Sequence, residues 1–185
     1  GINYLTKGKF ELPHLQDHVS EGTNIATSIG NYFSTMLDQS MNWKDAEKLC
    51  SQWGGHFALK GVMSVQDAKR AVDIGCSGIM VSNHGGRQLD AGQSTLHALQ
   101  SLNKKYENQI TIMMDSGLRS GTDVARTLAS GAKFTFLGRS FMYGVGALGR
   151  QGGEHTMELI KTELKQVMDQ VGCEKALDLP DFLIK

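Results

Sequence analysis

The segment from Gly78 to Asp90 reads Gly-Ile-Met-Val-Ser-Asn-His-Gly-Gly-Arg-Gln-Leu-Asp, and it decides the fold class of this 185-residue chain. A short apolar run leads directly into a polar loop that carries His84 and Arg87. Such runs are typical of strands buried in a parallel sheet. In proteins built on parallel sheets, ligands bind at the carboxyl ends of the strands. The segment therefore predicts a buried strand whose C-terminal end carries functional side chains.

The same pattern recurs along the chain. The predicted strands are Phe57–Lys60, Gly78–Ser82, Ile110–Asp115 and Phe134–Gly138. The predicted helices are Trp43–Trp53, Val65–Ile74, Thr95–Tyr106, Thr122–Ala129 and Glu154–Val171. Alternation of strands and helices indicates an α/β domain, either a doubly wound sheet or a barrel.

Local signals place the ends of these elements. Capping boxes at Ser64–Asp67 and Ser120–Asp123 mark two helix starts, and Asn42 is expected to cap the first helix. Gly75 and Gly131 are expected to end two helices in the left-handed conformation. Residues 1–41 show no clear period, so we expect a long connecting segment with one short helix around Tyr32–Leu37.

The polar strand ends favour a barrel over a doubly wound sheet. Each predicted strand ends in a functional residue type: Lys60, Ser82, Asp115 and then Gly138 with Arg139. Four consecutive strands directed at one site suit the top face of a (β/α)8 barrel, whereas a doubly wound sheet concentrates its site at one switch point. Four such units make half a barrel, whose open strand edges would need a partner.

Composition excludes several classes of protein. The 19 basic and 19 acidic side chains cancel and form no basic stripe, so no nucleic acid is expected as a partner. Cys50, Cys76 and Cys173 lack the spacing of a zinc site or a disulfide framework, so no metal is expected and a reducing cytoplasm fits. No apolar run approaches the length of a membrane span. We expect a cytoplasmic protein, with peripheral membrane association as an open alternative.

His84 and Arg87 suggest chemistry next to a carboxylate. Histidine can accept a proton near neutral pH, and arginine can hold a carboxylate through two parallel hydrogen bonds. The residues alone leave a second interpretation open, in which both side chains only solvate a tight turn. The other histidines, at positions 14, 18, 56, 97 and 155, have no recognisable partner, and no role is assigned to them.

Two later loops suggest a phosphorylated ligand. In Asp115–Asp123, small residues leave backbone N–H groups accessible, Arg119 supplies charge and a helix start follows. Gly138-Arg139-Ser140 repeats this chemistry one strand later. Together the loops favour a phosphorylated cofactor over purely structural turns. Lys60 is either a solvated strand end or a cation directed at an electron-rich ring of the ligand.

Four motifs resemble one enzyme family. They are Leu59-Lys-Gly-Val62, Ser82–Asp90, Asp115–Val124 and Leu137-Gly-Arg139, which occur in the order and spacing of the FMN-dependent α-hydroxy acid dehydrogenases and oxidases. The resemblance runs from about Leu12 to the C-terminus and covers the C-terminal half of that family. It implies that residues 42–185 form strands 5–8 of a TIM (β/α)8 barrel. Residues 1–41 would then form the loop region between strands 4 and 5.

The resemblance also implies a role for each site residue. His84 would be the active-site base, and it would bind the substrate together with Arg87, which would hold the carboxylate. Lys60 would lie by the pyrimidine end of the flavin, and Ser82 would contact it. The ribityl chain and phosphate would be held by Asp115, Ser116, Gly117, Leu118, Arg119, Gly138 and Arg139.

The implied activity is FMN-dependent oxidation of a small L-2-hydroxy acid, with L-lactate favoured, in an intact parent enzyme. We expect this chain to be a fragment that needs the missing N-terminal half or a second copy, and the intact enzyme to be a homo-oligomer. The alternative function is a non-catalytic half-barrel that at most binds FMN or phosphate. A phosphate-binding barrel of another chemistry, such as a sugar-phosphate isomerase, shares the phosphate loops but does not explain His84 with Arg87.

Overall fold

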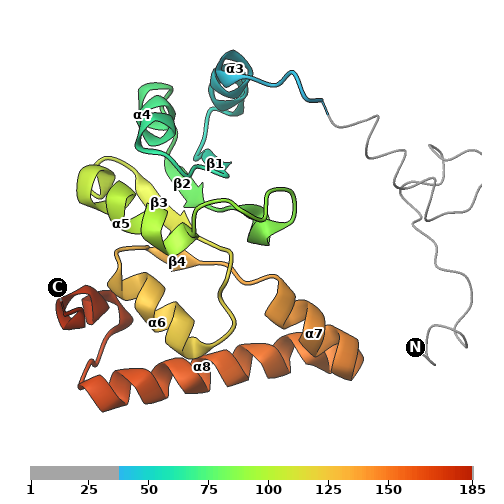
Figure 1. Ribbon diagram of the computed structural model, residues 1–185, viewed down its shortest axis with the longest axis vertical. Helices are drawn as coiled ribbons and strands as arrows, with labels where there is room; N and C mark the ends of the chain where they lie inside the picture. The colour runs from blue at the N-terminus through green and yellow to red at the C-terminus, as the bar shows by residue number, and fades with distance from the viewer. Residues whose placement is uncertain (1–37, 185) are drawn as a thin grey trace, which may run out of the picture. The chain divides into compact units, whose positions relative to one another are not determined.

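The computed structural model describes residues 38–184, and residues 43–185 form one compact unit (Figure 1). The expected helix at Tyr32–Leu37, His14 and His18 lie outside the described residues. The elements in chain order are α3 (Trp43–Trp53), β1 (Ala58–Lys60), α4 (Val65–Asp73), β2 (Gly78–Val81), η2 (His84–Gly86), α5 (Thr95–Tyr106), β3 (Thr111–Met114), α6 (Gly121–Ala129), β4 (Phe134–Thr135), α7 (Arg139–Leu148), η3 (Gly149–Gln151), α8 (Gly152–Val171) and η4 (Ala176–Phe182).

The four strands form one parallel sheet in chain order, which confirms the predicted α/β class. Their register places Lys60 beside Met80, Met80 beside Met113 and Met113 beside Phe134. Helices α4, α5 and α6 lie along one side of this sheet (Figure 1). The carboxyl ends of all four strands therefore open onto the same edge of the sheet.

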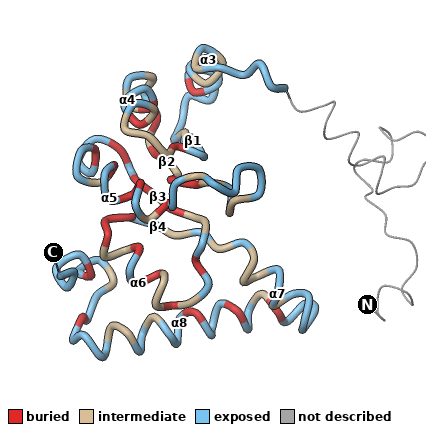
Figure 2. The backbone as a smooth tube through the Cα atoms, viewed as in Figure 1, coloured by how far each residue is buried: buried red, intermediate tan, exposed pale blue. Residues whose placement is uncertain are grey.

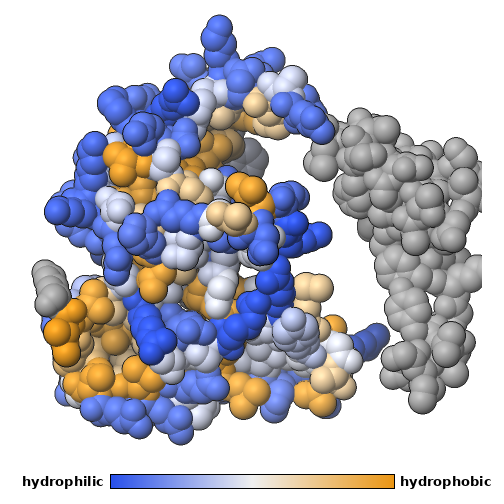
Figure 3. Space-filling view, viewed as in Figure 1, coloured by the Kyte–Doolittle hydropathy of each residue, from blue (hydrophilic) through white to orange (hydrophobic). Residues whose placement is uncertain are grey.

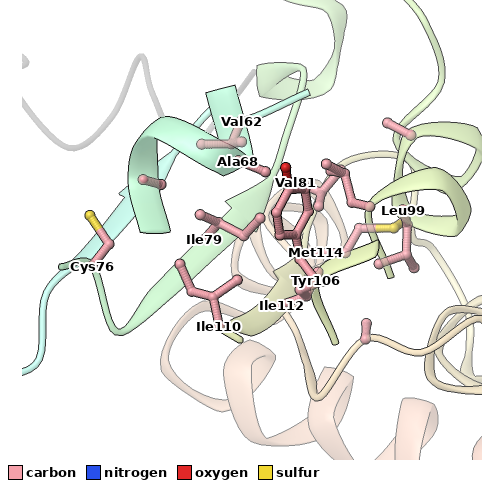
Figure 4. Close-up of a cluster of buried hydrophobic side chains, with 14 of the residues drawn as sticks. Val62, Ala68, Cys76, Ile79, Val81, Leu99, Tyr106, Ile110, Ile112 and Met114 are labelled. Atoms are coloured by element: carbon pink, nitrogen blue, oxygen red, sulfur yellow. The ribbon is translucent and has the colours of Figure 1, made fainter. Parts of the chain in front are cut away.

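The core lies between the sheet and these helices. Ile79 and Val81 on β2 and Ile112 on β3 alternate with less buried residues and are at most 1% exposed. Leu99 and Leu102 of α5 pack in the same cluster with no exposed surface. Figure 4 shows strand and helix side chains converging there, and Figure 2 shows the buried segments concentrated around β2 and β3. The core fixes the two central strands whose ends carry the site.

Most helix boundaries agree with the sequence prediction. Helices α3 and α5 have the predicted bounds, and α6 starts with a complete capping box between Ser120 and Asp123. Gly75 and Gly131 have φ values of 84° and 103°, which confirms the predicted left-handed helix ends. Within the described part of the chain, none of the helices has the length and apolarity that crossing a membrane requires.

The three cysteines are free and buried, as expected for a chain without a disulfide framework. Burial, together with neighbouring Cys50, raises the pKa of Cys76 to about 11. A thiol with so high a pKa stays protonated at neutral pH and acts as a small apolar group in the core.

Helix α7 was missed from the sequence, where Leu137–Ser140 was predicted as a loop. Gly144 and Gly146 lower the helix propensity of this segment, which hides the helix from propensity and periodicity. Tertiary packing overrides that propensity, because α7 lies against α8 at a close approach between Gly144 and Gly152. The helix matters for the site because it begins at the carboxyl end of β4.

Candidate active site

A cleft of about 640 Å³ lies at the carboxyl ends of β2, β3 and β4. Its lining consists of His84, Gly85, Arg87, Asp115, Ser116, Gly117, Leu118, Arg119, Phe136, Leu137, Gly138, Arg139, Met142 and Tyr143. The structure thus brings together every site residue predicted from the sequence except Lys60 and Ser82. Those two lie next to the cleft and reach it through Asp115.

Lys60, Ser82 and Asp115 form a polar network across three strand ends. The Lys60 ammonium donates a hydrogen bond of 2.7 Å to the Ser82 hydroxyl and lies 2.9 Å from a carboxylate oxygen of Asp115. Ser82 is only 3% exposed, and its hydroxyl also accepts a hydrogen bond of 3.1 Å from the His84 N–H. The network ties the start of the His84 turn to the neighbouring strands.

This network controls the charge of Asp115. Burial alone would raise the pKa of Asp115, but hydrogen bonds from Ser82, Lys60 and Ser116, together with the charge of Lys60, outweigh burial and hold it below the ordinary value of 3.8. Asp115 is therefore a carboxylate at neutral pH. Its negative charge also compensates the positive charge of Lys60.

The lowered pKa predicts how stability changes in acid. A carboxyl group with a folded-state pKa below its unfolded value stabilises the fold above the unfolded value, and this contribution is lost as the pH falls through the folded pKa. Asp115→Asn should lower the urea midpoint at neutral pH and flatten its decline below about pH 4. Urea titrations between about pH 7 and 3 measure this.

Asp73→Asn is the control, because Asp73 forms an exposed ion pair with Lys69, and such pairs contribute little. Equal pH profiles for wild type and Asp115→Asn would contradict the role assigned to Asp115.

The turn that carries His84 has an unusual backbone. His84, Gly85 and Gly86 have φ values of 56°, 68° and 71°, a left-handed conformation that is uncommon for a residue other than glycine. The Asn83 side chain accepts a hydrogen bond from the Gly85 N–H and supports the turn. His84 and Arg87 are both exposed, and no described residue hydrogen-bonds the His84 ring or the Arg87 guanidinium. Both side chains are thus available to a ligand in the cleft.

The opposite end of the cleft is suited to an anion. Helix α7 begins at Arg139, and none of the described side chains caps its N-terminus. The Ser140 hydroxyl nearby is buried without a partner among the described residues. Uncapped helix starts attract phosphate through free N–H groups and the helix dipole. Arg119 and Arg139 add two positive charges.

Most N–H groups at the start of α6 already have partners, which corrects the part of the sequence interpretation that placed a free helix start after Asp115–Arg119. The Asp123 carboxylate accepts hydrogen bonds from the N–H groups of Arg119 and Ser120, and Glu163 accepts one from Gly121. Burial would raise the pKa of Asp123, but these two N–H groups and the Ser120 hydroxyl hold it below its ordinary value. The free helix start in the cleft is that of α7.

Comparison with known proteins identifies the family. Residues 4–185 match the sequence profile of a family described as FMN-dependent dehydrogenase. The chain belongs to this family. This confirms the resemblance found in the sequence motifs.

Two curated relatives of this FMN-dependent dehydrogenase family member carry the name L-lactate dehydrogenase. The one from Vibrio cholerae serotype O1 (strain M66-2) is 40% identical over 177 residues, which are 94% of this chain and 47% of the relative. The one from Serratia proteamaculans (strain 568) is 41% identical over 170 residues, 90% of this chain and 45% of the relative. The chain thus spans about half the length of the curated relatives it matches.

Solved structures are also similar to this chain. The crystal structure of mandelate oxidase with 3,3-difluoro-2-hydroxy-3-phenylpropionic acid has a TM-score of 0.73 and 35% identity, and the match covers 76% of this chain and 43% of the other. The crystal structure of mandelate oxidase with (S)-4-hydroxymandelic acid gives a TM-score of 0.72 and 35% identity, with 75% and 39% covered.

The cleft fits the cofactor on which the FMN-dependent dehydrogenase family depends. FMN ends in a phosphate, and the uncapped start of α7, the unpartnered Ser140 hydroxyl and two arginines supply the donors that a phosphate requires. The cleft volume also lies in the usual range for small-molecule sites. Among residues 38–184, no group of three or more histidine, cysteine, aspartate or glutamate side chains is placed to hold a metal ion.

Sequence reasoning missed the apolar wall of the cleft. Phe136 and Leu137 follow β4, and Met142 and Tyr143 lie on the first turns of α7. Met142 and Tyr143 are 70% and 66% exposed. Alternation in Phe134-Thr-Phe136 was an available signal for Phe136, because residues two apart in a strand share a face. The two α7 residues had no such signal, because α7 itself was not predicted.

Proposed function

We propose that this chain contributes the FMN-binding and substrate-binding residues of an enzyme that oxidises a small L-2-hydroxy acid, such as L-lactate, to the 2-oxo acid. The observation that carries the proposal is the common cleft. At one end it holds a base and a guanidinium that no described residue hydrogen-bonds, and at the other a site suited to phosphate. The names of the relatives and of the solved neighbours support a 2-hydroxy acid as the substrate.

His84 and Arg87 have different roles toward the substrate. The guanidinium of Arg87 binds the substrate carboxylate through two hydrogen bonds and fixes its orientation. Oxidation of the hydroxy acid removes two electrons and two protons, and the His84 imidazole accepts a proton from the bound substrate. FMN, when bound, would supply the acceptor for the two electrons and for the other proton.

The remaining residues hold the cofactor and the site. Arg119, Arg139 and the backbone around Gly138 would hold the phosphate of FMN, and Gly117 and Leu118 would hold the ribityl chain. Lys60 and Ser82 would lie near the flavin ring in this proposal. Their hydrogen bonds to each other and to Asp115 support a second task, which is to hold that edge of the site in place.

We propose further that β1–β4 correspond to strands 5–8 of a (β/α)8 barrel, with residues 1–41 preceding them as a loop region. The sheet face away from the helices supports this, because its side chains, Ala58, Lys60, Met80, Met113, Phe134 and Phe136, are exposed or half-buried. Apolar side chains also gather at the surface over α7 and the C-terminal segment (Figure 3). An N-terminal half of such a barrel or a second copy would cover the open face and edges of the sheet.

Titration of the 185-residue chain with FMN, followed by flavin fluorescence and absorbance, tests the proposal. We expect saturable binding that Arg119→Ala and Arg139→Ala each weaken by about 10- to 100-fold, because each removes a charged hydrogen-bond donor to phosphate. Arg150→Ala is the matched control, because Arg150 is exposed in η3 and does not line the cleft.

Adding L-lactate to the FMN complex separates the two candidate functions. Bleaching of the flavin absorbance would support the enzyme, and binding without bleaching would favour a half-barrel that only holds FMN or phosphate. Equal FMN affinity in the wild type and in the Arg119→Ala, Arg139→Ala and Arg150→Ala variants would contradict the proposed phosphate site.

A further inference from the structure

The Ser116 hydroxyl connects two loops of the cleft. It donates a hydrogen bond of 2.7 Å to one oxygen of Asp115 and accepts one of 3.0 Å from the N–H of Gly85. Gly85 directly follows His84 in the turn after β2, whereas Ser116 follows β3. The hydroxyl therefore fixes the turn of His84 to the end of the neighbouring strand.

The backbone on both sides of this contact is strained. His84 and Ser116 have φ values of 56° and 72°, and they are the positive-φ residues other than glycine in the described chain. Such conformations persist where the surrounding structure enforces them, and they cluster at functional sites. Here the two strained residues lie on the two loops that the Ser116 hydroxyl joins. The strain and the hydrogen bond thus belong to one local arrangement.

Further contacts hold both partners in place. The Thr95 hydroxyl, which is buried at the start of α5, donates 3.2 Å to the carbonyl of Ser116. Arg139 donates 2.7 Å to the carbonyl of Gly85. The peptide unit on each side of Gly85 is therefore bound by a different loop, and a side chain at Gly85 would lie 2.9 Å from the Arg139 guanidinium.

We infer that Ser116 is a positioning residue for His84. The connection runs from Lys60 to Asp115, then through the Ser116 hydroxyl to Gly85 and the adjoining His84. A hydroxyl has one donor and two acceptor positions. Asp115 and Gly85 use the donor and one acceptor, which leaves Ser116 little capacity for the cofactor. That this placement of His84 matters for catalysis rests on the proposed function. That Ser116 positions His84 does not depend on the proposed function.

Nuclear magnetic resonance of the labelled 185-residue chain tests the inference. Ser116→Ala should make the Gly85 amide exchange about three- to tenfold faster, because Asn83 still accepts one hydrogen bond while that to Ser116 is lost. The His84 ring resonances should shift or broaden. Ser116→Gly should do the same, although glycine adopts the positive φ without strain. The urea midpoint should change little in Ser116→Gly.

Ser64→Ala is the matched control, because Ser64 caps α4 in another βα loop and does not contact the His84 turn. It should lower the urea midpoint while Gly85 exchange and the His84 resonances stay as in wild type. Unchanged Gly85 exchange and His84 resonances in both Ser116 variants would overturn the inference. So would equal changes in Ser64→Ala. These measurements use neither FMN nor a hydroxy acid, so their outcome is independent of the proposed activity.

Discussion

Replacing His84 with alanine is expected to reduce oxidation of L-lactate by about 10²- to 10⁴-fold, the usual contribution of a positioned general base. The reason is that His84 has an exposed ring in the cleft without a described partner, so it is available to take the proton of the substrate. The measurement is steady-state turnover in an enzyme assembled from this chain and the part of the Vibrio cholerae relative that it does not cover.

Arg87→Ala separates binding from proton transfer in the same assay. Loss of the carboxylate contact should raise KM strongly, whereas His84→Ala should act mainly on kcat. His97→Ala is the matched control, because His97 is exposed on α5 and does not line the cleft. Turnover by His84→Ala within about threefold of the His97→Ala variant would remove His84 from its proposed role.

The sequence was sufficient for the elements that carry the core. Short apolar runs predicted all four strands, and capping residues placed the starts of α4 and α6 at Ser64 and Ser120. These features are local, since a buried strand and a capped helix start need only neighbouring residues to be recognised. The strands were predicted too long at their ends, because the ladder stops where the loops turn into the cleft, as at Asp115.

The sequence predicted which residues form the site, but not the contacts that hold those residues in place. The motifs gave His84, Arg87 and the two arginines of the phosphate end, because residue chemistry is visible in the sequence. The positive φ of Ser116 and the hydrogen bond from the Gly121 N–H to Glu163 depend on contacts between segments far apart in the chain. Neither follows from spacing along the chain. The same is true of α7, whose stability derives from α8.

The packing of α7 on α8 leads to the second large effect. A methyl group at Gly144 would overlap the Thr156 hydroxyl and lie 2.6 Å from the Gly152 carbonyl, so Gly144→Ala must separate the two helices. At Gly146 in the same helix nothing lies within 4 Å of that position. Overpacking costs about 1–3 kcal/mol, whereas Gly→Ala at an open helix position gains about 0.5–1 kcal/mol. We expect Gly144→Ala to lower and Gly146→Ala to raise the free energy of unfolding in urea.

The difference between the Gly144→Ala and Gly146→Ala variants should also affect the cleft, because α7 begins at Arg139 and carries Met142 and Tyr143. Separation of α7 from α8 moves the helix start that is proposed to bind the phosphate of FMN. Gly144→Ala should therefore weaken FMN binding in the fluorescence titration, while Gly146→Ala retains wild-type affinity. If both alanine variants shift the free energy of unfolding in the same direction, the close approach at Gly144 does not hold α7 in place.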